Sequence, residues 1–236
     1  MKTSTKIKTW NEFWKRDINQ WSYNLIIVDV IRRLKPEKII EIGAGSGIDI
    51  IELHKLNFDV TYSDFSEIAL KKFKDGNPNI KAVKCDVRKL PFSDNSYDLV
   101  FSLGLLEHFN EKDRKKAIEE LFRISKRYVL IDVPQKFSPR NIYKKLLIFL
   151  NKWPFGKEIE FSYYKLVKEV KIVVKDVRIV ERYGRNFLIF LRGEFQEKIY
   201  NKFIKPCGFK NTYINMHRYF WWGWAVSIGI VFEKNK

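Results

Sequence analysis

The 236-residue chain is long enough for one large α/β domain, or for such a domain with an appended lobe. Its hydrophobic content of 45% is ordinary for a globular protein and excludes a disordered chain. It has no run of about 18 uncharged apolar residues and no apolar stretch near its start, so we expect a cytoplasmic protein without a transmembrane helix or a secretory signal. The two cysteines cannot form a disulfide framework or a four-ligand zinc site by themselves, and we expect no metal.

The net charge of +17 is unevenly distributed. Residues 1–134 carry 24 Lys and Arg against 20 Asp and Glu, whereas residues 135–236 carry 21 against 8 and hold 22 of the 37 aromatic residues. A basic, aromatic segment suits an anionic partner such as nucleic acid or a membrane surface. A lysine-rich solvated surface around an aromatic core explains the same pattern, and both interpretations stay open.

Apolar periodicity predicts a helix over 8–34, which Pro36 ends. Strands and helices then alternate. The predicted strands are 38–42, 58–63, 79–85, 96–102 and 127–133, and the predicted helices are 48–56, 66–73 and 111–125. Ser66 is the expected N-cap of the second helix. Such alternation indicates right-handed β-α-β units and a parallel sheet.

The pattern weakens after Pro134. Helices are predicted over 138–150, 162–170 and 195–204, and strands over 172–180 and 224–232. We therefore divide the chain into an N-terminal helical segment (1–35), a cofactor-binding core (36–134) and an acceptor-binding or lid region that completes the sheet (135–236). One domain with an insertion is the alternative.

A glycine-rich loop, Gly43-Ala44-Gly45-Ser46-Gly47, follows the first predicted strand and feeds a helix. Glycines let the backbone approach a ligand closely, and a helix N-terminus presents unpaired N–H groups to negative charge. The spacing is G-x-G-x-G, with Ile48 where the nicotinamide-type fingerprint has its third glycine, which disfavours an oxidoreductase. Asp64, 21 residues after Gly43, ends the second strand and can accept hydrogen bonds from both hydroxyls of a ribose.

Four motifs then occur in order, each at a strand end: Glu41–Gly47, Ser63–Ser66, Cys85–Phe92 and Asn95–Val100. Together they resemble the class I S-adenosylmethionine-dependent methyltransferases, and within them the small-molecule branch that includes the ubiquinone and menaquinone biosynthesis methyltransferases. The resemblance covers about residues 36–134. It implies a Rossmann-like three-layer α/β sandwich with a mostly parallel seven-stranded sheet, N-terminal helices and a mixed C-terminal acceptor region.

The resemblance also implies S-adenosylmethionine as the cofactor and assigns its contacts. The implied cofactor-binding residues are Glu41, Gly43, Ala44, Gly45, Gly47, Asp64, Phe65, Asp86, Val87, Ser102 and Leu103. The loop and Glu41 would hold the methionyl end, Asp64 the ribose and Asp86 the adenine amino group. Phe65 and Val87 would contact the adenine, whereas Ser102 and Leu103 would face the methionyl group and sulfonium. The alternative for both aspartates is an ordinary turn or helix-cap role, and for Glu41 a surface strand end.

Methyl transfer to a hydroxyl or an acidic carbon also needs a base. His108 follows the fourth strand directly and is the candidate catalytic base, with a packing role at a helix start as the alternative. His54 lies within the first helix of the core and is predicted to be structural. His217 lies in a basic aromatic region where nothing in the sequence positions it.

The acceptor is less constrained. The N/D-P-P-Y/F segment of amino-base methyltransferases is absent at 102–105, and Cys207 is predicted to lie in a turn. We expect a small-molecule acceptor of lipid-like or aromatic character. The alternatives are an RNA methyltransferase that uses the basic C-terminal half, and a non-catalytic cofactor-binding partner protein.

An amphipathic stripe lies within 138–153. Ile142, Leu146, Phe149, Leu150 and Trp153 share one helical face, with basic residues largely on the other. Together with the aromatic run 219–224, this segment could make peripheral membrane contact. The interpretation that the sequence favours is that the stripe packs on the cofactor domain. The oligomeric state stays open.

Overall fold

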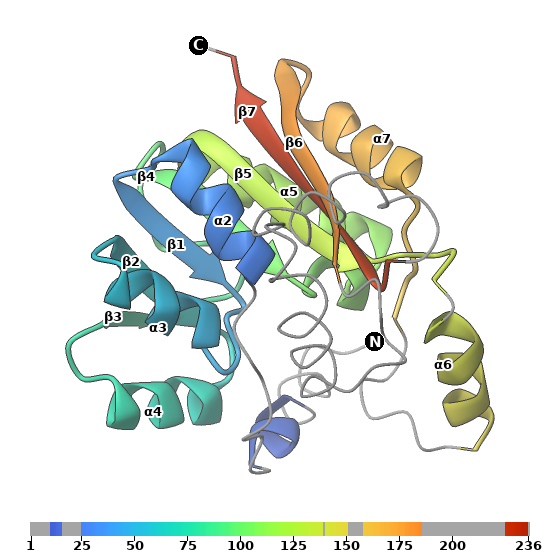
Figure 1. Cartoon of the computed structure of the whole chain (residues 1–236), viewed down its shortest axis with the longest axis horizontal. Coiled ribbons are helices and arrows are strands. Elements are labelled where there is room, and N and C mark those ends of the chain that lie inside the picture. The colour runs from blue at the N-terminus through green and yellow to red at the C-terminus, as the bar shows by residue number, and fades with distance from the viewer. Residues whose placement is uncertain (1–9, 16–24, 139, 151–157, 186–224, 236) are drawn as a thin grey trace, which may run out of the picture.

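The computed structural model describes residues 10–15, 25–138, 140–150, 158–185 and 225–235. Its centre is a seven-stranded sheet with the strand order β3-β2-β1-β4-β5-β7-β6 (Figure 1). The strands are β1 (Lys38–Ile42), β2 (Asp59–Asp64), β3 (Lys81–Lys84), β4 (Tyr97–Leu103), β5 (Ser125–Pro134), β6 (Val177–Arg185) and β7 (Ser227–Lys234).

Five strands of this sheet run parallel, since every pair among β1 to β5 is parallel. β7 lies antiparallel between β5 and β6. The first crossover runs outward from β1 through β2 to β3, and the chain then returns to place β4 on the other side of β1. Ligands bind at such a switch point, outside the carboxyl ends of the strands. The predicted Rossmann-like, mostly parallel sheet is therefore confirmed.

Helices cover both faces of the sheet. They are α2 (Leu25–Leu34), α3 (Ile48–Lys55), α4 (Glu67–Gly76), α5 (Glu111–Ile124), α6 (Arg140–Phe149) and α7 (Tyr163–Val173), with the short 3-10 helix η1 (Leu106–His108). Figure 1 shows α2, α3 and α4 in front of the sheet and α5 behind it, whereas α6 lies at the edge of the molecule. No helix in the described part of the chain is both long and apolar enough to cross a membrane.

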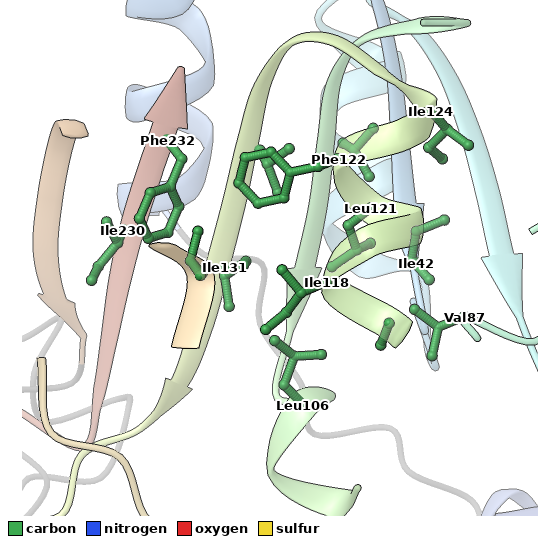
Figure 2. Close-up of a cluster of buried hydrophobic side chains, with 14 of the residues drawn as sticks. Ile42, Val87, Leu106, Ile118, Leu121, Phe122, Ile124, Ile131, Ile230 and Phe232 are labelled. Carbon is green, nitrogen blue, oxygen red and sulfur yellow. The ribbon is translucent and has the colours of Figure 1, made fainter. Parts of the chain in front are cut away.

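Each face of the sheet has its own apolar core. In one, Ile118, Leu121 and Phe122 of α5 pack against Ile131 and Phe232 of the sheet (Figure 2). α7 adds side chains to the same core. The other core joins the front helices to the opposite side chains of the same strands. Successive residues of a strand point to opposite faces, so strands buried on both faces read as continuous apolar runs.

Side-chain caps fix where three helices begin. The Ser66 hydroxyl accepts a hydrogen bond from the Ala69 amide at 3.2 Å, which confirms the predicted cap of α4. Asn110 caps α5 in the same way through the Asp113 amide, and Ser162 caps α7 through the Lys165 amide. Each cap satisfies one of the N–H groups that a helix start leaves without a partner inside the helix.

The C-terminal half departs from the predictions in one element. The strand predicted over 172–180 exists but is shifted, because α7 continues to Val173 and β6 runs from Val177 to Arg185. The apolar run Ile172-Val173-Val174 resembles a strand locally, but the buried Leu166 and Val170 extend the helix, and pairing with β7 begins only after the helix ends. The predicted helix 195–204 lies outside the described residues, as does much of the predicted helix 8–34.

Candidate functional site

The glycine loop between β1 and α3 has the backbone conformation that its sequence demands. Gly43, Gly45 and Gly47 have φ angles of 73°, 55° and 69°, a region that residues with a Cβ rarely adopt. The amides of Gly43 and Ala44 both donate to the Ser63 carbonyl, at 3.0 and 2.9 Å. Gly47 then caps the start of α3. The loop therefore aims a helix N-terminus at the carboxyl edge of the sheet, where an anionic group can bind.

Asp64 ends β2 and holds this loop in place. Its carboxylate accepts hydrogen bonds from the Gly45 amide and the Ser66 amide, both at 2.8 Å. Burial raises the pKa of Asp64, and the hydrogen bonds from backbone amides oppose that shift. The side chain lies beside the glycine loop at the carboxyl edge of the sheet, and it connects the ends of two neighbouring strands. Phe65, the next residue, is half-buried beside it.

Two side chains that the sequence analysis missed support the same loop. The Tyr62 hydroxyl donates to the Gly45 carbonyl at 2.7 Å, and the Ser63 hydroxyl donates to the Glu41 carbonyl at 2.7 Å. The Tyr62 ring stacks on Phe73 of α4, with 3.9 Å between centroids. Burial is the main cause that raises the pKa of Tyr62, which keeps the hydroxyl protonated as a donor. The sequence signal that could have identified them is that β2 ends in three consecutive residues with polar side-chain groups.

Asp86 follows β3 in a tight turn closed by the Lys89 amide, which donates to the Asp86 carbonyl at 2.9 Å. Its carboxylate accepts from the Arg88 amide and guanidinium at 2.5–3.1 Å. Burial tends to raise the pKa of Asp86, but these hydrogen bonds from Arg88 outweigh it and leave the pKa below its usual range. Val87 is buried beneath the turn. Arg88, which also reaches Asp113 of α5, was not identified from the sequence.

Glu41 and Ser102 lie near the carboxyl ends of β1 and β4, two neighbouring strands. Both side chains are buried, so the alternative that Glu41 is a surface strand end is wrong. The Ser102 hydroxyl is buried and has no hydrogen-bond partner in the described part of the chain. A buried hydroxyl without a partner is costly in a native protein, and it fits a polar group of a bound ligand. Leu103 is half-buried beside it.

His108 ends η1, directly after β4. Its ring contacts the Trp10 ring edge-on, with 4.9 Å between centroids. Trp10 belongs to a short helical stretch at 10–14 that crosses the same edge of the sheet. In that stretch Asn11 accepts from the Ser66 hydroxyl at 2.7 Å, and a Cβ added to Gly45 would lie 2.4 Å from the Trp14 ring. These N-terminal contacts were not identified from the sequence, because nothing local connects residues 10–14 to the loop.

Other candidates lie elsewhere. His54 is exposed on α3, whereas His217 and Cys207 fall outside the described residues. Glu107 of η1 and Asp132 of β5 are both buried, and neither was identified from the sequence. In the described ranges, no three His, Cys, Asp or Glu side chains are grouped closely enough to hold a metal ion.

Comparisons with known proteins agree with this geometry. Residues 39–127 match the family described as a methyltransferase domain. The demethylmenaquinone methyltransferase of Paenarthrobacter aurescens is 33% identical over 129 residues, which are 52% of this chain and 50% of that protein. The chain therefore spans about half the length of this relative, and slightly less of its counterpart from Renibacterium salmoninarum, at 33% identity over 43% of this chain and 42% of the relative.

Two solved structures share the fold across nearly the whole chain. The magnesium protoporphyrin IX methyltransferase of Synechocystis, with bound S-adenosylhomocysteine, has a TM-score of 0.64 at 14% identity and covers 99% of this chain and 100% of that one. An S-adenosylmethionine-dependent methyltransferase of Thermotoga maritima has a TM-score of 0.60 at 15% identity, with 98% and 96% covered. The chain therefore has the fold of the class I S-adenosylmethionine-dependent methyltransferases, and its residues 39–127 match a methyltransferase domain in sequence.

Proposed function

We propose that the protein transfers the methyl group of S-adenosylmethionine to a small-molecule acceptor of lipid-like or aromatic character. The observation that carries the proposal is the glycine loop with three left-handed glycines, tied to Asp64 at the switch point of a parallel sheet. The cofactor supplies an electrophilic methyl group on a sulfonium, so its leaving group needs no activation by the protein. The protein's contribution is to position the reactants and to exclude water.

The cofactor contacts are assigned to residues whose geometry fits them. Asp64 already accepts one backbone hydrogen bond on each oxygen, and each oxygen has a further lone pair for a ribose hydroxyl. Phe65 lies beside it for the adenine face. Asp86 is assigned to the adenine amino group, and because Arg88 already places two hydrogen bonds on each Asp86 oxygen, this contact requires Arg88 to release one of them; Val87 is buried beneath the turn.

The methionyl end is assigned to the other side of the switch point. The backbone of Gly43, Ala44, Gly45 and Gly47 would receive it together with Glu41. Leu103 and Ser102 would line that side of the methionyl position. The Ser102 hydroxyl is buried and lacks a protein partner among the described residues. This assignment gives Ser102 a hydrogen-bond partner that the described protein does not supply.

His108 is the proposed general base for an acceptor that must lose a proton. It lies at the same edge as the glycine loop, directly after β4, and the Trp10 ring restricts its orientation. A base within hydrogen-bond reach of the acceptor removes the proton as the carbon–methyl or oxygen–methyl bond forms.

The acceptor class rests on the related proteins and on composition. The names of the relatives refer to a demethylmenaquinone and a magnesium protoporphyrin, both ring-bearing molecules. Residues 135–236 hold most of the aromatic side chains, and we assign acceptor binding to this region, the cofactor to residues 36–134 and a helical cover to residues 1–35. The excess of basic residues in 135–236 is the observation behind the RNA alternative, and the assay below separates RNA from a small-molecule acceptor.

The test has two arms that use the full chain. Calorimetry with S-adenosylhomocysteine measures cofactor binding, and absence of binding would reject the proposal. A panel of quinols, phenols, porphyrins and short RNAs, assayed for transfer of a radiolabelled methyl group, measures activity. Transfer to a ring-bearing small molecule supports the proposal, whereas transfer only to RNA, or binding without any transfer, contradicts it.

A further inference from the structure

Helix α6 is oriented with its polar side inward. Asn141 and Lys144 are 7% and 4% exposed, and they lie three residues apart on one face of the helix. The opposite side is apolar and open to solvent. Its exposed fractions are 52% for Leu146, 82% for Phe149 and 47% for Leu150. The expectation that this stripe packs on the cofactor domain is therefore wrong for Leu146, Phe149 and Leu150. The side chain of Ile142, and Trp153, lie outside the described residues.

Specific polar contacts impose this orientation. The Asn141 amide donates to the carbonyls of Gln135 and Lys136, at 2.9 and 2.6 Å. The Lys144 ammonium forms ion pairs with Glu158 at 2.9 Å and with Glu160 at 3.8 Å, and all three side chains are largely buried. Turning the helix to bury its apolar side would break this network and leave buried charges without partners.

The chain segment that holds Lys144 is itself fixed to the body of the protein. Phe161 donates its amide to the Pro134 carbonyl at 3.1 Å and accepts from the Lys136 amide at 2.7 Å. The Ile159 amide donates to the Glu107 carbonyl at 2.9 Å, in the 3-10 helix that carries His108. The exposed apolar face is thus a consequence of the fold, and its anchor extends to the rim of the candidate site.

We define the α6 patch as Leu146, Phe149 and Leu150, with the exposed Phe137 just before the helix. Large apolar side chains exposed together on one side of a helix mark an interaction surface. The surroundings of the patch are positively charged. Lys136 and Lys145 are exposed next to Phe137 and Leu146 in the chain, whereas the charge of Lys144 is balanced by Glu158 and Glu160.

We propose that the α6 patch docks on an anionic lipid bilayer, with the helix lying in the plane of the membrane interface. A helix of ten residues is about 15 Å long, which is too short to span a bilayer of about 30 Å but sufficient to lie on it. The apolar side chains enter the interface while the lysines attract the lipid headgroups. A second copy of this chain fits less well, because a two-fold interface would bring the same cations face to face.

The experiment measures co-sedimentation of the full chain with lipid vesicles. One set is phosphatidylcholine alone and the other also contains phosphatidylglycerol. We expect binding to the anionic vesicles that weakens as salt rises. The double variant Leu146→Gln/Phe149→Gln should lower the partition coefficient by about ten-fold or more, because two side chains no longer enter the apolar interface.

Helix α7 provides the matched control, since Tyr164 and Ile172 are 67% and 61% exposed. The variant Tyr164→Gln/Ile172→Gln removes similar apolar surface and should leave vesicle binding unchanged. For the charge contribution, Lys136→Glu/Lys145→Glu should weaken binding by about five-fold per lysine at low salt. The corresponding control, Lys168→Glu/Lys171→Glu on α7, should have a much smaller effect.

Three outcomes would overturn the proposal. The first is that the wild type fails to sediment with anionic vesicles at low salt. The second is that the α6 and α7 variants lose binding equally. The third is a concentration-dependent dimer, seen by analytical ultracentrifugation and abolished by Leu146→Gln/Phe149→Gln, without vesicle binding. Calorimetry with S-adenosylhomocysteine on every variant reports the cofactor site separately, so failure of docking is distinguishable from failure of the proposed function.

Discussion

The carboxylate of Asp64 accepts a hydrogen bond from the amide of Gly45 at 2.8 Å, across the gap between the ends of β2 and β1. The same carboxylate accepts from Ser66 at the start of α4. One buried side chain therefore sets the position of the glycine loop and of a helix N-terminus on either side of the proposed ribose position. Its structural and binding roles do not exclude each other, because a carboxylate can accept about four hydrogen bonds.

Replacing Asp64 by alanine should weaken S-adenosylhomocysteine binding by about a hundred-fold, because hydrogen bonds to a charged group are worth about 1.5–3 kcal/mol each. Titration calorimetry measures the change. Asp59, exposed at the opposite end of the same strand, provides the control: Asp59→Ala should bind as the wild type does. Unchanged affinity in Asp64→Ala would remove this residue from the cofactor site.

Replacing His108 by alanine should lower kcat by about 10² or more while the affinity for S-adenosylhomocysteine stays the same, since general-base catalysis contributes about 10²–10⁴. The measurement compares turnover on the best acceptor of the panel with calorimetry of the same variant. His54→Ala, on the exposed side of α3, should behave as the wild type. A His108→Ala variant with full turnover would leave the histidine only its packing contact with Trp10.

Acid should remove part of the stability that Glu120 contributes. Glu120 of α5 accepts from the Leu90 amide at 2.6 Å and pairs with Arg123, and the hydrogen bond from Arg123 is the main cause that lowers the pKa of Glu120 in the folded protein. A lowered folded-state pKa means that this stabilisation is present above the unfolded pKa and is lost as pH falls through the folded value.

At neutral pH, Glu120→Gln should therefore lower the free energy of unfolding by about 1 kcal/mol, and the difference from the wild type should shrink below about pH 4. Urea denaturation at neutral pH and again below about pH 4 measures the free energy of unfolding of both proteins. The neighbouring Glu119 is exposed on the same helix, so Glu119→Gln serves as the control. An equal loss for Glu120→Gln at both pH values would show that the ionised form is not responsible.

Cys85 should react very slowly with thiol reagents in the folded protein. It is buried at the end of β3, and burial is the main cause that raises its pKa to about 11. Because the thiolate is the reactive form, modification near pH 8 should be about a hundred-fold or more slower than in the unfolded chain. The background Cys207→Ser isolates the signal of Cys85, and urea provides the unfolded reference. A fast reaction without urea would contradict the burial of this strand end.

The sequence alone determined the parallel half of the sheet and the glycine loop at its edge. Strands β1 to β5 are apolar runs in the sequence because both faces of a parallel sheet are buried. The glycines at 43, 45 and 47 mark positions of positive φ, which residues with a Cβ rarely adopt. Chain order then placed Asp64 and Asp86 at the same edge, since parallel strands end on one side. These signals are local, and the structure has the three glycines in the left-handed conformation and both aspartates at the carboxyl edge of the sheet.

The tertiary structure decided whatever depends on contacts between distant segments. Trp10 and Trp14 reach His108 and Gly45 only because the N-terminal stretch crosses the sheet edge, and no local pattern carries that information. The orientation of α6 is the clearest case. Its sequence has an apolar face and a polar face, and periodicity alone favoured burying the apolar one. The carboxylates of Glu158 and Glu160 reverse that choice, because a buried ion pair is satisfied only when Lys144 points inward.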